Sequence, residues 1–89
     1  MHMNTHLLAA IDAALAGDWS GAHKIVQKYE DDSLACWIHA LLHKIEGDAS
    51  NSRYWYSQTT HAYGDYAEVA QEWAAIKREL ENGSTALTT

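Results

Sequence analysis

The chain has 89 residues, enough for one domain with a modest core. Its formal net charge is −6, and its six basic residues are scattered among twelve acidic ones. A nucleic-acid-binding protein needs a basic stripe to neutralise phosphates, so the composition excludes that class. The chain contains no proline and one cysteine. These features favour helices joined by tight turns and exclude an internal disulfide.

Apolar residues recur at helical spacing, and Gly-Asp pairs separate the resulting segments. Glycine accepts the left-handed conformation at a helix end, and aspartate caps the next helix by accepting backbone N–H bonds. The pattern predicts an all-α fold of five short antiparallel helices. We expect one compact domain over residues 1–81 and a frayed tail over residues 82–89. The predicted helices cover about residues 4–16, 19–29, 34–46 and 49–58, and a fifth begins at Asp65.

The first predicted helix is apolar on one face and is interrupted by Asp12. No basic region precedes it, so it is typical of an amphipathic helix rather than a signal peptide. No apolar run reaches the roughly 18 residues of a membrane span, and we expect a cytoplasmic protein without membrane contact. After the second helix, the acidic run 30–32 is expected to be a solvated loop that caps the third helix.

The third predicted helix has the clearest amphipathic pattern in the chain. His39, His43 and Glu46 lie off its apolar stripe at i, i+4 and i+7, so they share another face. An i, i+4 histidine pair can chelate a transition metal, and Glu46 is a candidate third ligand. Candidates to complete the site are His23, His61 and Asp48.

Two other interpretations of these histidines remain open. They can pack beside a neighbouring helix and bond tyrosine hydroxyls, or they can contact a small ligand or a peptide. The zincin pattern requires Glu directly after the first His, and Ala40 excludes that protease class. Cys36 is expected to be a packed, unreactive thiol. Without a complete catalytic signature, the sequence favours a non-enzymatic protein with no cofactor, and a divalent transition metal is the alternative.

The fourth predicted helix carries the run Tyr54-Trp55-Tyr56, which covers too wide an arc for one-sided burial. We expect Tyr54 and Trp55 in the core and Tyr56 partly exposed. Alternatively, the exposed ring lines a groove or a dimer interface with Asn51 and Arg53, because aromatic residues and arginine are enriched at interfaces.

The fifth predicted helix begins at Asp65, which has capping-box spacing to Glu68. Its side chains at helical spacing predict a second apolar stripe that packs on the rest of the domain. The members of this stripe are Tyr66, Val69, Trp73, Ile76 and Leu80.

Residues 13–29 read AALAGDWSGAHKIVQKY, and residues 39–58 read HALLHKIEGDASNSRYWYSQ. Both segments resemble tetratricopeptide hairpins, in which a small residue and Gly-Asp end the first helix. The resemblance covers about residues 5–60. It implies a helical scaffold that binds peptides or partner proteins, and it assigns no catalytic residue. The sequences WIHA, EGD and RYWY within residues 37–56 are also similar to a group of short bacterial proteins of unassigned function.

The sequence therefore predicts a small helical scaffold or interaction domain that binds a protein or peptide partner, or a second copy of itself. The alternative is a metal- or small-ligand-binding domain that uses the face of His39, His43 and Glu46. The candidate binding residues are His39, His43, Glu46, Asn51, Arg53, Tyr54 and Tyr56.

Overall fold

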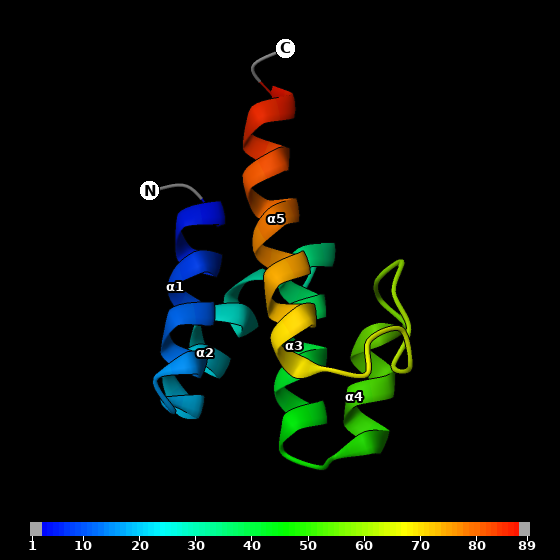
Figure 1. Cartoon of the computed structure of the whole chain (residues 1–89). Coiled ribbons are helices and arrows are strands. Elements are labelled where there is room, and N and C mark those ends of the chain that lie inside the picture. Colours follow the sequence, from blue (N-terminus) through cyan, green and yellow to red (C-terminus); the bar gives the residue numbers. More distant parts are fainter. Residues whose placement is uncertain (1–2, 88–89) are drawn as a thin grey trace.

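The computed structural model of the protein describes residues 3–87, with the side chains of residues 3–82. This part of the chain contains helices and no strand, which confirms the predicted all-α class (Figure 1). The elements are α1 (Met3–Leu15), α2 (Trp19–Val26), the 3-10 helix η1 (Gln27–Tyr29), α3 (Ser33–Ile45), α4 (Ala49–Tyr56) and α5 (Val69–Leu87). None of these helices combines the length and apolarity needed to cross a membrane.

The helices form two packed pairs, α1 with α2 and α3 with α4, and α5 lies against α1 and α3 (Figure 1). α3 is central, because every side chain from Ala35 to Leu42 is buried. The sequence predicts an apolar stripe on this helix, whereas neighbours cover it on several faces. His39, predicted to lie off the stripe, is therefore buried as well, and Cys36 is buried as expected for a packed thiol. The tetratricopeptide-like arrangement itself stays a prediction.

Two Gly-Asp pairs make the tight turns within the helix pairs. Gly17 and Gly47 adopt φ of +87° and +84°, in the left-handed region that glycine tolerates best. The next residue in each case, Asp18 or Asp48, caps the following helix by accepting a backbone N–H three residues on. Each dipeptide thus ends one helix and starts another, as predicted.

The third Gly-Asp pair does not start a helix, so the predicted beginning of α5 at Asp65 is wrong. Residues 57–68 form a loop, which we call the anchored loop, and α5 begins at Val69. Lys44 Nζ donates to the carbonyl oxygens of Tyr63 at 2.8 Å and Tyr66 at 3.0 Å. Because these carbonyls are held by a side chain, the loop is fixed without a helical hydrogen-bond ladder.

The far end of α5 also differs from the prediction. The helix continues to Leu87, through most of the segment 82–89 that the sequence predicts as a frayed tail. The second predicted helix, in contrast, ends early, because its last residues form η1 rather than α-helix. The remaining helix bounds lie within about two residues of those predicted, which is the usual spread of helix ends.

A buried carboxylate joins α3, α4 and α5. Glu72 is fully buried, and its Oε2 accepts hydrogen bonds from Trp37 Nε1 at 2.8 Å and from the Tyr56 hydroxyl at 2.5 Å. Its Oε1 accepts from Lys44 Nζ at 3.1 Å. A buried charge is tolerated when it is paired and hydrogen-bonded in this way. Burial and the bond to Glu72 raise the pKa of the Tyr56 hydroxyl.

Candidate metal centre

Three histidine rings from two helices meet between α2 and α3. The cap at Asp18 starts α2 so that His23 lies in its second turn, opposite His39 and His43 on successive turns of α3. Their ring centroids are 5.2 Å apart for His23 and His39, and 5.0 Å apart for the other two pairs. One ring nitrogen of each histidine lies within 4.8 Å of the others. We call these three residues the histidine cluster.

A backbone acceptor orients one of the three rings. His23 Nδ1 lies 3.1 Å from the Trp19 carbonyl oxygen, which favours a proton on Nδ1 and a lone pair on Nε2. His43 Nδ1 lies 3.6 Å from Glu46 Oε1 and 3.7 Å from Asp48 Oδ2, beyond hydrogen-bond distance, and this buried nitrogen has no hydrogen-bond partner among residues 3–82. A carbonyl partner such as that of His23 commonly accompanies a metal-binding histidine, because it fixes the tautomer and leaves the other nitrogen for the ion.

His39 is the innermost member of the histidine cluster. It is only 4% exposed, and its ring stacks on Trp55 of α4 with centroids 4.1 Å apart. Burial first, and then the neighbouring His23 and His43, lower the pKa of His39 to about 4. The ring is therefore neutral at pH 7, and a lone pair is available to a metal without competition from a proton.

Convergent lone pairs on neutral imidazoles repel one another, and a cation between them converts that repulsion into attraction. Zinc binds histidine nitrogen at about 2.0–2.1 Å, which places tetrahedral ligand nitrogens about 3.4 Å apart. The nitrogens of the histidine cluster lie within 4.8 Å of one another. Small side-chain rotations would bring them to ligating distance, so the cluster is suited to a divalent transition metal.

The structure brings together two of the three predicted ligands, His39 and His43, and adds His23 as the third. Glu46 does not belong to the group of converging donor atoms. It follows the last residue of α3 as its C-cap, and its carboxylate faces His43 Nδ1. His61, another predicted candidate, lies elsewhere and stacks on Trp37 with centroids 3.6 Å apart.

The candidate partner-binding residues of α4 differ in exposure, because Asn51, Arg53 and Tyr54 are exposed and Tyr56 is buried. Asn51 Nδ2 donates to Asp48 Oδ2 at 2.6 Å within the helix cap. Arg53 lies over the ring of Tyr63, with its guanidinium carbon 4.7 Å from the centroid. The expected exposure of the aromatic run is wrong at both ends. Tyr54 is 56% exposed and Tyr56 is 3% exposed, because the Tyr56 hydroxyl reaches Glu72.

Sequence reasoning missed Lys44 and Glu72, which anchor the loop and the polar core. A signal for Glu72 was present in the sequence. It lies four residues before Ile76 and eight before Leu80, on the apolar stripe of α5, and an acid at a core position needs a buried partner. The pairing with Lys44 gives no local signal, because 28 residues separate the two.

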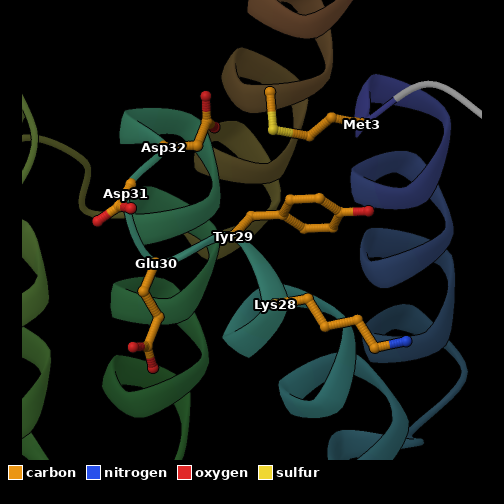
Figure 2. Close-up of a pocket in the computed structure, with 6 residues that line it drawn as sticks. All are labelled: Met3, Lys28, Tyr29, Glu30, Asp31 and Asp32. Carbon is orange, nitrogen blue, oxygen red and sulfur yellow. The ribbon is translucent and has the colours of Figure 1, made fainter.

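A shallow hollow of about 330 Å³ lies where α1 approaches the connection between η1 and α3 (Figure 2). Figure 2 shows the Tyr29 ring directed from η1 toward α1, where its hydroxyl meets His6 Nδ1 at 2.5 Å. Asp32 caps α3 by accepting the Ala35 N–H at 2.9 Å, as predicted for the acidic run. The Tyr29 hydroxyl and the Asp32 carboxylate, two polar groups of this hollow, are thus already used within the fold.

No family model, curated protein or solved structure matches the chain. The geometry of the histidine cluster is therefore the basis on which a function is assigned.

Proposed function

We propose that the protein is a small metal-binding domain that takes a divalent ion of the zinc class through His23, His39 and His43. The observation that carries this proposal is the convergence of three imidazoles, one of which, His23, has its Nδ1 oriented by a backbone carbonyl. Imidazole donors suit zinc, copper, nickel and cobalt, whereas calcium and magnesium prefer oxygen ligands.

An ion at the histidine cluster would link three helices. His23 comes from α2, His39 and His43 come from α3, and Trp55 of α4 stacks on His39. Binding to the folded state alone stabilises it by mass action, by about 2.7 kcal/mol when the free ion is at 100 times its Kd. The proposed role of the metal thus includes holding α2 against the α3–α4 pair.

Calorimetric titration of untagged protein with Zn²⁺ tests the proposal. We expect one ion per chain with a Kd below about 1 μM, equivalent to about −8 kcal/mol. The variant His23→Gln should bind at least tenfold more weakly, and its half-buried site on α2 makes loss of folding a small risk. The control is His6→Gln, which replaces an exposed histidine of α1 outside the cluster. A wild-type Kd above this limit, or equal binding by His23→Gln, would contradict the proposal.

The stacking of Trp55 on His39 provides a second readout. A paramagnetic ion such as Cu²⁺ at the cluster should quench Trp55 fluorescence, because quenching is efficient at contact distance. The variant Trp55→Phe should lose most of this response while it retains the other tryptophans. Quenching that is unchanged in Trp55→Phe would place the ion elsewhere on the chain.

The second candidate function is self-association, and the exposed Tyr54 ring beside Trp55 favours it. Tyrosine is a frequent anchor at protein interfaces. Sedimentation equilibrium of the wild type and Tyr54→Ala tests this function. A dimer that dissociates in Tyr54→Ala supports it, and a monomer across the concentration range rejects it.

A further inference from the structure

The histidine cluster supplies three donors, and no fourth His, Cys, Asp or Glu side chain within residues 3–82 joins it. The nearest carboxylates, Glu46 and Asp48, face Nδ1 of His43. Neither carboxylate belongs to the group of donor atoms that lie within 4.8 Å of one another, so neither is placed as a fourth ligand.

The burial of the three rings shows on which side of the ion the remaining position lies. His39 is the inner ligand, because it is 4% exposed and is backed by the Trp55 ring. His23 and His43 are half-buried and flank it from α2 and α3. The coordination position opposite His39 therefore faces outward, toward solvent.

We infer that an ion in this centre keeps that outward position for water or a small monodentate anion, so that the centre is an exchangeable binding site rather than a closed structural one. This inference rests on the proposed metal-binding function. Closed structural zinc sites have four protein ligands, whereas three ligands and an open position characterise sites that exchange water or substrate. Three neutral imidazoles leave the full charge of the ion in place, which favours an anion in the open position.

Two hollows in the surface of the domain lie apart from the histidine cluster. The hollow beside Tyr29, of about 330 Å³, is lined by residues of α1, η1 and the acidic run. A second hollow of about 300 Å³ lies against α4 and the anchored loop. Neither is lined by His23, His39 or His43. Neither of these two hollows thus provides a binding pocket for an organic ligand beside the ion.

Cobalt substitution tests the inference, because Co²⁺ replaces zinc and its visible spectrum reports coordination. The full chain is loaded with one equivalent of Co²⁺ and titrated with sodium azide, with dialysis to measure retained metal. We expect a saturable shift of the visible bands while Co²⁺ stays bound. Co²⁺ in buffer with azide is the blank, and His23→Gln is the variant that should show neither bands nor shift.

Each other outcome overturns the inference in a distinguishable way. An unchanged spectrum with Co²⁺ retained means that the centre is closed, and the metal-binding proposal stands without the exchangeable position. Release of Co²⁺ into the dialysate means that azide competes with the protein rather than adding to the ion. Absence of Co²⁺ bands together with absence of Zn²⁺ binding in calorimetry removes both proposals.

Discussion

The indole N–H of Trp37 donates to Glu72 across 35 positions of sequence, with a nitrogen–oxygen distance of 2.8 Å, and both residues are fully buried. The Tyr56 hydroxyl donates to the same carboxylate oxygen. This shared acceptor joins three helices at one point. Removing one donor leaves a buried charge with fewer partners, which costs more than an ordinary surface change.

The Tyr56→Phe variant should lose about 1.5–3 kcal/mol of unfolding free energy, because the deleted hydroxyl bonds a charged acceptor. Urea denaturation followed by circular dichroism measures this change. Tyr54→Phe is the matched control, since it removes the same atom from a ring that is 56% exposed. Its effect should stay within about 0.5 kcal/mol. Equal effects of the two substitutions would contradict the role assigned to Glu72.

The Asp48→Asn variant should weaken Zn²⁺ binding by up to about tenfold, because it removes a negative charge that lies 3.7 Å from His43 Nδ1 and favours a cation on that ring. Asparagine caps a helix as well as aspartate does, so α4 should remain intact. The control is Asp18→Asn, which changes the matching cap of α2. Calorimetry that gives the same Kd for both variants would show that Asp48 does not support His43.

The Gly17→Ala variant should lose about 1–2 kcal/mol of unfolding free energy, because a β-carbon is sterically unfavourable at a φ of +87°. Gly64→Ala is the control, since Gly64 lies outside the left-handed region. No atom lies within 4 Å of an added β-carbon at either glycine. The comparison of the two variants therefore isolates the energetic cost of the left-handed backbone conformation at Gly17. Similar thermal unfolding midpoints for the two variants would argue against this account of the turn.

The metal-free protein should lose stability as the pH falls from about 6.5 to about 4. His39 has a folded-state pKa of about 4 against an ordinary value of 6.5, so the unfolded chain binds the extra proton in that interval. Stability is therefore highest above pH 6.5 and falls by about 3 kcal/mol at most as the pH approaches 4. Urea denaturation in chelator at several pH values measures the slope.

The variant His39→Gln should flatten this slope, since glutamine does not titrate in the interval. His6→Gln is again the control, because the pKa of His39 owes its shift to burial and to the other two cluster histidines. An identical slope in the wild type and His39→Gln would show that other groups dominate the acid response.

The sequence predicted the turns that depend on local chemistry. Gly17 and Gly47, each followed by aspartate, were enough to locate α1 to α4 within about two residues of most of their ends. The same dipeptide at Gly64 gave a wrong prediction. There the conformation of the loop is set by Lys44, which lies about 20 residues away along the sequence. Its Nζ donates hydrogen bonds to two carbonyl oxygens of the loop. Local patterns do not report such a contact.

The histidine pair was predictable, because i, i+4 spacing places two side chains on one helix face. The third histidine of the cluster was not, since His23 approaches only through the packing of α2 on α3. The sequence offered Glu46 as the third ligand, and His23, His61 and Asp48 as candidates to complete the site. For the same reason Tyr56 was misplaced, because its burial follows from an acceptor on α5 rather than from its neighbours in α4.

The position of Glu72 on the last helix has a consequence for the order of folding. During synthesis, Trp37, Lys44 and Tyr56 leave the ribosome before the carboxylate that accepts their hydrogen bonds. Until residue 72 has emerged, burying these groups would leave polar atoms without partners, so the nascent α3–α4 pair must keep them in water. Final closure of the core is therefore delayed until α5 is being made, and a shorter nascent chain gains little from premature collapse.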